Sequence, residues 1–593
     1  MMNLVVGGTQ IIRCMGTFKN RIQKGKEAMK KKENSLKRVI AGILAAGMMI
    51  SMTACGGGSS SSAAEATTST TESTQETASA TKAEPEGSDE TFYLVSSNKA
   101  EETVRMRHCW VDNGYLYQQL TFRGLFLADS TLENVQPDLA ADYQVSDDGL
   151  VYTITMKDNL KWSDGEPLTA EDVRFSIKTL LHAALSNAIY TTAFNKIVGA
   201  EEWVDGTADD LAGLTVDGNT ITMTLTEPYN NMIKVLAQFT IYPEHCLADA
   251  DPAELHNNEF WEHPVGSGMY YLSEFNPGNY FVLEPNPYYE GEPAKIKRIQ
   301  INFVSDNVTE AQANRVDYYD TNSPSDISEF NKLSAYTGNI VDILFFRYFI
   351  CNLDDGQGNV NELIADPRVR EAFMYAIDKN TLIESLFPDL ATATNTGLPS
   401  YDPNYDSSLN QYPYDPEKAK QLLEEANFDF SKTLKIRYYY NDQPTIDFMQ
   451  AIAYYLGEVG VQCDVQAFTE SGTSGMFVTR DYDICYKGLA AFDISEWYGE
   501  YSSSNANFSK ILGGDTSFDE LYNELLTVSS EEEKATVLKK LQALEQEKLF
   551  KLPLATFNNY IYINTDRVWV PEGVTFGNPR YRYDMDFENW KMY

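Results

Sequence analysis

Length, composition and charge limit what this chain can be. Its 593 residues are too many for one compact domain, so two or three folded lobes are expected. Hydrophobic residues make up 43% of the chain and aromatic residues 12%, which indicates a folded body with aromatic-lined surfaces. The formal net charge of -39 argues against a nucleic-acid partner, because phosphate binding needs a basic face. We interpret the acidity as a contribution to solubility, with steering of a cationic ligand as the alternative.

The N-terminal segment has the form of a targeting signal. A basic stretch beginning at Lys30 precedes an apolar core at 39–52, which is too short to span a bilayer as a stable helix. The sequence Met-Thr-Ala-Cys that ends at Cys55 resembles the lipobox of bacterial lipoproteins. This resemblance implies a signal peptide at 1–54, lipidation of Cys55 and a lipid-anchored, extracytoplasmic location. Met29 is an alternative start, because a lipoprotein leader normally opens with Met-Lys-Lys-Lys.

Residues 55–90 are expected to form a disordered tether. The segment consists mainly of Gly, Ser, Thr, Ala and Glu. Such a composition buries too little apolar surface to offset the entropy lost on ordering.

The cysteine and histidine residues indicate no metal site or cofactor. No CxxC pair is present, and the five cysteines after Cys55 are far apart in sequence, so isolated buried thiols are expected rather than a disulfide framework. Three of the five histidines lie in one region but lack metal-ligand spacing. They are His245, His256 and His263.

The stretch 137–181 is expected to form a strand pair followed by a helix. After a turn at 147–149, Tyr152, Ile154 and Met156 recur at the period of two that is typical of a half-buried strand. Thr169 is the expected N-cap of the helix, with acidic residues in the first turn. The expected buried stripe of the helix is Val173, Ile177, Leu180 and Leu181.

Three further elements are predicted along the chain. The segment 220–225 alternates Thr with Ile221, Met223 and Leu225, which predicts a strand with one buried face. Asp-Pro pairs at 366–367 and 415–416 each predict the start of a helix, because Asp caps the first turn and Pro tolerates the first helical position.

These motifs together resemble the signature of bacterial solute-binding proteins that serve ABC importers of the peptide/nickel class. The resemblance extends from about residue 91 to the C-terminus. The matching residues are Pro137, Leu139-Ala140, Trp162, Asp164-Gly165, Pro167 to Ala170, Asp172-Val173, Phe175-Ser176, Pro264 to Tyr270, Asn286 to Tyr289, Asp366 to Ala372, Asp378 and Asp415-Pro416.

The resemblance implies an α/β, two-lobed fold of the type II periplasmic-binding-protein class. The expected organisation is lobe I at 91–345 with an inserted subdomain at about 131–264, lobe II at 346–550, and a return to lobe I at 551–593. The ligand is expected to lie between the lobes.

The resemblance also implies a ligand anchor in the C-terminal third of the chain. Peptide-binding members hold the ligand's α-ammonium with a carboxylate that follows a buried strand. Here 481–488 is the expected strand, and Asp493 is the candidate anchor. Ala490, Ala491 and Phe492 would supply backbone contacts, and Trp497 a wall of the site. The alternative for Asp493 is a cap or turn residue.

Other ligand-binding candidates lie elsewhere in the chain. Tyr115 and Tyr117 occupy the region that lines the cleft in the family, although aromatic residues at such spacing are often core residues. Three arginines are candidates for binding a ligand carboxylate, and the sequence does not rank them. They are Arg347, Arg437 and Arg480.

The predicted function is that of a membrane-anchored, monomeric substrate-binding protein that captures oligopeptides and delivers them to an ABC permease and its ATPase. The alternatives are an oligosaccharide or another small solute as ligand, and a sensor that signals without transport. The chain is not expected to be an enzyme, because GxSxG, HExxH and P-loop motifs are missing from its sequence.

Overall fold

The structure, a computed structural model, describes residues 83–97, 108–111, 114–354, 358–440, 442–528 and 530–593. The chain divides into two units, Met1–Thr81 and Lys82–Tyr593, and every described residue belongs to the second. The predicted signal peptide, Cys55 and most of the predicted tether therefore lie outside the described residues. Among the described helices, none is both long enough and apolar enough to cross a membrane.

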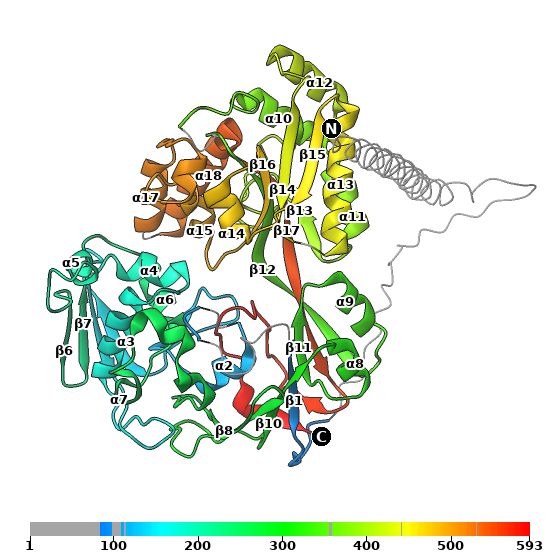
Figure 1. Cartoon of the computed structure of the whole chain (residues 1–593). Coiled ribbons are helices and arrows are strands. Elements are labelled where there is room, and N and C mark those ends of the chain that lie inside the picture. Colours follow the sequence, from blue (N-terminus) through cyan, green and yellow to red (C-terminus); the bar gives the residue numbers. More distant parts are fainter. Residues whose placement is uncertain (1–82, 98–107, 112–113, 355–357, 441, 529) are drawn as a thin grey trace, which may run out of the picture. The chain divides into compact units, whose positions relative to one another are not determined.

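A seven-stranded mixed sheet connects two lobes of the second unit (Figure 1). Its order is β11-β17-β12-β16-β14-β15, and β13 pairs with β17. β12 and β17 are antiparallel and pair from Tyr336 opposite Asn564 to Ile350 opposite Lys551. In Figure 1 these two strands, green and orange-red, run together from one lobe to the other. The bounds are β11 (Tyr318–Thr321), β12 (Tyr336–Cys351), β13 (Ala391–Ala393), β14 (Thr433–Tyr438), β15 (Gln462–Ala467), β16 (Ile484–Ala490) and β17 (Lys551–Asn564).

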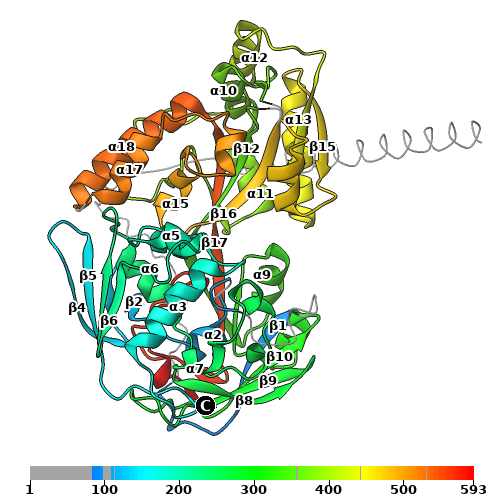
Figure 2. The same ribbon diagram turned by 60° about the vertical axis from the view of Figure 1, so that its left-hand side comes forward.

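The first lobe contains two four-stranded sheets, which are seen together in Figure 2. One has the order β1-β10-β9-β8 and the other the order β4-β5-β7-β6, with shorter pairs β2-β3 and β18-β19 beside them. The bounds are β1 (Phe92–Ser97), β2 (Phe126–Ala128), β3 (Val135–Pro137), β4 (Ala140–Val145), β5 (Val151–Met156), β6 (Leu214–Asp217), β7 (Thr220–Thr224), β8 (Tyr270–Asn276), β9 (Tyr280–Pro285), β10 (Ile299–Val304), β18 (Val568–Trp569) and β19 (Lys591–Met592).

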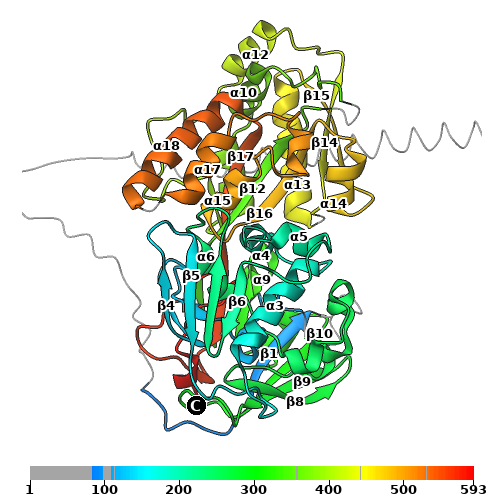
Figure 3. The same cartoon turned by 90° about the vertical axis from the view of Figure 1, so that its left-hand side faces the viewer.

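The predicted strand pair and helix of the first lobe are confirmed. β5 buries Tyr152, Ile154 and Met156, and α3 follows beside the β4–β7 sheet (Figure 3). Asp172 accepts a hydrogen bond from the backbone N–H of Thr169, so the predicted first turn is closed by a capping interaction. The helices of this lobe are α2 (Leu116–Thr121), α3 (Ala170–His182), α4 (Ala188–Phe194), α5 (Ala200–Val204), α6 (Met232–Gln238), α7 (Glu244–Leu247), α8 (Asn307–Gln312) and α9 (Pro324–Phe330).

Helices of the second lobe cover both faces of the large sheet. Both predicted Asp-Pro helix starts are confirmed: Asp366 caps α10 and Asp415 caps α12, each by accepting a backbone N–H. The helices are α10 (Pro367–Ala376), α11 (Lys379–Leu386), α12 (Pro416–Glu425), α13 (Gln443–Glu458), α14 (Gly472–Ser474), α15 (Ile494–Gly499), α16 (Phe508–Ile511), α17 (Asp519–Thr527) and α18 (Glu531–Lys548).

The alternation of β12 divides the hydrophobic core in two. Phe345 and Phe349 belong to a cluster that extends through both lobes, whereas Phe346 and Tyr348 face a second cluster around Trp497. Both faces of β12 are therefore buried. The predicted lobe boundaries near 345 and 550 fall within β12 and just before β17, and they remain predictions.

Substitution of Gly268 would test the close packing of the first lobe. A β-carbon at this position would lie 2.2 Å from the carbonyl oxygen of Leu120, which is backbone and cannot turn away. We expect Gly268→Ala to lower the free energy of unfolding in urea by about 1–3 kcal/mol.

The matched control is Gly457→Ala in α13, where an added β-carbon meets nothing within 4 Å. This change should stabilise the protein by about 0.5–1 kcal/mol, because alanine favours a helix over glycine. Equal effects of the two substitutions would contradict the packing described here.

Candidate ligand-binding site

The strands that connect the lobes are irregular where the lobes meet. The pairing of β12 with β17 shifts between Asp342 and Phe345, and Leu344 has a positive φ of 42°. Such a bulge breaks the regular hydrogen-bond ladder and increases the local bend of a strand. This position is therefore a structural candidate for a hinge.

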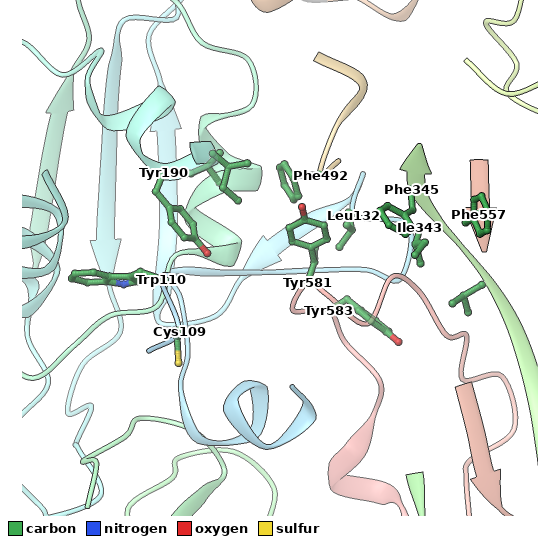
Figure 4. Packing of buried hydrophobic residues seen from close by; sticks show 14 of the residues in the cluster. Cys109, Trp110, Leu132, Tyr190, Ile343, Phe345, Phe492, Phe557, Tyr581 and Tyr583 are labelled. Atoms are coloured by element: carbon green, nitrogen blue, oxygen red, sulfur yellow. The ribbon is translucent and has the colours of Figure 1, made fainter. Parts of the chain in front are cut away.

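The segment that follows β16 contacts both lobes at this point. The backbone N–H of Ala491 donates to the carbonyl oxygen of Leu344 at 3.1 Å. The ring of Phe492 packs against Tyr581 of the C-terminal return, with ring centroids 5.1 Å apart (Figure 4). The expected backbone-contact residues Ala490, Ala491 and Phe492 thus lie at the junction of the lobes.

Asp493 is the N-cap of α15 and is 8% exposed. Its carboxylate accepts the N–H of Ser495 at 2.8 Å and lies 3.9 Å from the Lys534 ammonium. Burial alone would raise the pKa of this carboxyl group, but the charges of Lys534 and Lys234 and the Ser495 hydrogen bonds bring the pKa below its usual value. The candidate anchor is therefore held ionised, and its charge is partly balanced by lysine.

Glu496 completes a reciprocal cap at the same helix end. Its carboxyl oxygen accepts the backbone N–H groups of Phe492 and Asp493. Burial, helped by the charges of Asp493 and Glu500, raises the pKa of Glu496 to about 8. At neutral pH this side chain is mainly protonated.

Trp497 lies in the core of the second lobe. The side chain is fully buried, its indole N–H donates to Glu545 at 3.2 Å, and the Lys551 ammonium lies 4.0 Å from the ring centroid. The sequence placed this residue in a wall of the ligand site. In the structure its ring packs against Phe346 and Tyr348 of β12.

Tyr115 and Tyr117 lie in the first lobe with their rings stacked at 5.2 Å. They line a cavity of about 230 Å³ together with Arg580 of the C-terminal return. The side-chain amide of Gln119 donates to the carbonyl oxygen of Tyr581, which ties α2 to that return. The remaining lining residues are Leu94, Val95, Ser96, Gly114, Leu116, Asn307, Tyr318, Tyr319 and Asp320.

Arg580 was missed by sequence reasoning. No motif surrounds it, and its place beside Tyr115 depends on the return of the chain through β17. A lone arginine near a C-terminus carries no periodic or motif signal.

One group of side chains in the first lobe could hold a metal ion. Single ligand atoms of Asp164, His245 and Cys246 lie within 4.8 Å of one another, and His245 Nε2 is 2.9 Å from the Asp164 carboxylate. All three residues are exposed. The pKa of the Cys246 thiol is raised to about 11 by burial and by the neighbouring carboxylates, which disfavours the thiolate that binds metals. Asp164 lies far from His245 and Cys246 in the sequence, so the spacing of the three residues did not suggest a metal site.

The two lobes, the paired connecting strands and a junction lined from both sides define a two-lobed solute-binding protein. A family model described as bacterial extracellular solute-binding proteins, family 5 (middle region), matches residues 134–519. The chain belongs to this family. It is a family of solute-binding proteins and not of enzymes, in agreement with the sequence-based expectation.

Similar proteins support the family and the fold. A protein of Brucella ovis, provisionally named an ABC transporter peptide-binding protein, is 29% identical over 357 residues, which cover 59% of this chain and 63% of that protein. AppA of Clostridium difficile is 18% identical with a TM-score of 0.70, covering 85% of this chain and all of that one. Lactococcal OppA is 20% identical with a TM-score of 0.67, covering 84% and 99%. The expected two-lobed type II fold is confirmed.

The raised pKa of Glu496 predicts a pH dependence of stability. Its folded pKa of about 8 exceeds the ordinary value of 4.5, so the folded protein binds the proton more tightly. The contribution of this group to stability is therefore lost as pH rises from about 4.5 through 8. Glu496→Gln keeps the cap acceptor and removes the titration.

Relative to the original protein, Glu496→Gln should become more stable as pH rises across this range, by an amount on the order of a few kcal/mol. Urea unfolding of both proteins at several pH values measures the difference. A difference that stays constant with pH would show that Glu496 does not titrate in this window.

Proposed function

We propose that this chain is the membrane-anchored substrate-binding protein of an ABC importer, which captures oligopeptides between its lobes and delivers them to a permease. The Brucella relative carries the name of an ABC transporter peptide-binding protein, and the lactococcal OppA structure is titled as a complex with an endogenous peptide. These names support a peptide ligand, although the curated relative is matched over only 63% of its length.

An open strand edge at the lobe junction is the observation that carries the peptide assignment. β14 pairs with one side of β16 only as far as Tyr486, and β12 pairs with the other side. Among the described residues, no strand therefore pairs with the β14 side of β16 from Lys487 to Ala490. The N–H of Gly488 points to this edge, where it donates to the Tyr439 hydroxyl at 3.2 Å. Because alternate residues of a strand face the same edge, Ala490 faces it too. An extended peptide can add to such an edge through its backbone.

In this proposal Asp493 acts at the end of that edge. It follows Ala490 by three residues, and its carboxylate is ionised and buried. In this proposal the ammonium group of the ligand pairs with the Asp493 carboxylate, whose negative charge is now partly neutralised by lysine. The backbones of Ala490, Ala491 and Phe492 form hydrogen bonds with the ligand. Tyr115 and Tyr117 lie on the opposite lobe.

Transport follows from differential binding to the two arrangements of the lobes. A ligand that contacts both lobes binds the closed arrangement more tightly than the open one. The difference between these two binding free energies sets how far the equilibrium shifts toward the closed state. The β12 bulge is where the connecting strands can bend. The monomeric receptor would then dock on its permease and ATPase at the extracytoplasmic face of the membrane.

Native mass spectrometry of protein from residue 56 onward tests the ligand class. We expect adducts separated by amino-acid masses on protein purified without refolding. Asp493→Asn should weaken peptide binding about tenfold or more, because a charge-assisted contact is lost while the helix cap is kept.

The control is Asp366→Asn, the same change at the cap of α10, which should leave peptide binding unchanged. A single discrete adduct or sugar-spaced masses would contradict the peptide ligand. Undiminished binding by Asp493→Asn would assign Asp493 to the cap alone.

The proposed anchor is tested separately by Cys55→Ser in the full chain expressed in a bacterial host. The substitution removes the only thiol of the lipobox-like sequence, so we expect the protein to move from the membrane fraction to the soluble fraction. Mass analysis of the N-terminal peptide of the unchanged protein should show a lipid on Cys55. Membrane retention of the serine variant would contradict lipid anchoring at this residue.

A further inference from the structure

Three side chains of the kinds that bind transition metals meet in the first lobe. Asp164 precedes α3, and His245 and Cys246 lie on α7, 81 residues beyond Asp164 in the case of His245. One ligand atom from each residue lies within 4.8 Å of the other two, and no other set of three such side chains meets in this way among the described residues. His256 and His263, which the sequence places in the same region, are not part of this group.

Backbone hydrogen bonds fix the two segments that carry these side chains. One carboxylate oxygen of Asp164 accepts the N–H of Glu166 at 3.0 Å, which leaves its other oxygen facing His245 Nε2 at 2.9 Å. The N–H of Glu244 donates to the Asp172 carboxylate at 3.0 Å, so α7 is tied to the start of α3, beside which it lies (Figure 1). The metal-binding side chains therefore project from backbone that is already in place.

The three donor atoms together select a borderline-soft divalent ion. Zn²⁺ binds imidazole nitrogen, carboxylate oxygen and thiolate sulfur, at about 2.0–2.2 Å for nitrogen and oxygen and about 2.3 Å for sulfur. Ca²⁺ and Mg²⁺ prefer oxygen ligands alone, so this mixed set does not suit them. Three protein ligands leave a fourth position of a tetrahedral ion to be filled by water.

The spacing of the donors is close to that of a zinc site. Two ligands of one tetrahedral zinc ion lie about 3–4 Å apart, as follows from those bond lengths. The separation of His245 and Asp164 is near the lower end of this range, and the sulfur of Cys246 lies within 4.8 Å of both. All three side chains are exposed, so they can rotate to close the remaining gap and an ion can enter from solvent.

The charges around the group favour a cation. Burial and the negative charges of Asp164 and Asp172 raise the pKa of the Cys246 thiol to about 11. The same negative charges attract a positive ion. A thiol that coordinates a metal loses its proton outright, because the charge of the ion outweighs its surroundings. The Asp164 carboxylate and the Cys246 thiolate would then balance the two positive charges of the ion.

We propose that Asp164, His245 and Cys246 bind one Zn²⁺ ion, which fastens the turn before α3 to α7 and stabilises the first lobe. On binding, the S–H bond of Cys246 breaks, a sulfur–zinc bond forms and the proton passes to solvent. The ion is a structural part of the lobe and is separate from the residues proposed to contact the peptide. This inference therefore goes beyond the proposed function and does not depend on it.

The test uses the detergent-solubilised full chain, reduced and stripped of metal with a chelator. Co²⁺ replaces Zn²⁺ as a coloured probe, and a bond from sulfur to Co²⁺ gives a charge-transfer absorption in the near ultraviolet. We expect this absorption to reach its maximum at one Co²⁺ per chain and to disappear when Zn²⁺ is added. Zn²⁺ should also raise the melting temperature, because it binds the folded protein.

Cys246→Ser should abolish the absorption and weaken Zn²⁺ binding about 100-fold or more, since even contacts behind the ligands change metal affinity by about 10- to 100-fold. Asp164→Asn keeps the acceptor for the Glu166 N–H and should weaken Zn²⁺ binding at least about tenfold. The matched control is Cys463→Ser on β15, outside the group, which should change neither measurement.

Three results would overturn the inference. The first is an original protein that shows no charge-transfer absorption with Co²⁺. The second is an absorption that persists in Cys246→Ser, which would assign the metal to another thiol of the chain. The third is unchanged Zn²⁺ affinity in both Asp164→Asn and His245→Asn, which would reduce the site to a single exposed cysteine. Peptide binding is measured separately and is not affected by any of these results.

Discussion

The pairing of β12 with β17 is the constraint on which the rest of the structure depends. Because these strands are hydrogen-bonded from Tyr336 to Ile350, the chain enters the second lobe and leaves it along one ladder. Everything between the two strands folds as a continuous insertion, and the C-terminal return must lie beside the first lobe. The bulge at Asp342–Phe345 interrupts the ladder where the lobes meet, so the same strands that connect the lobes also provide a place to bend.

Buried charges tie the second lobe to that ladder. Glu500 accepts hydrogen bonds from Lys487 at 2.7 Å and lies 2.8 Å from Lys551, the first residue of β17. A buried carboxylate balanced by two ammonium groups is tolerated only when its geometry is well defined, since loss of one partner leaves an uncompensated charge. Glu500 directly follows α15, the helix capped by Asp493. The candidate anchor is therefore connected through one short helix to the strand that joins the lobes.

The local secondary structure was largely predictable from the sequence. The contacts and roles of individual side chains were less predictable. The alternation around Ile154 and the Asp-Pro helix starts depend on neighbours in the chain, and each was confirmed. Asp493 was named as an anchor or a cap. The structure shows the cap, while the anchor role depends on a ligand. Trp497 was expected to face the site and lies in the core instead, because the face that a short helix presents is chosen by the sheet beneath it.

The sequence by itself determined the family, the order of strands and helices and the segment in which a ligand anchor was sought, since fixed motifs and periodicity are properties of neighbouring residues. Only the tertiary structure decided which of the three candidate arginines forms no ion pair with a described residue. Arg437 pairs with Asp464 and Arg480 with Asp354, and no sequence motif links either pair. Arg347 instead contacts Tyr440 and lies close to Gly488 of the neighbouring strand. Charge pairing and burial depend on contacts between segments that are far apart in the chain, and such contacts cannot be read from the composition.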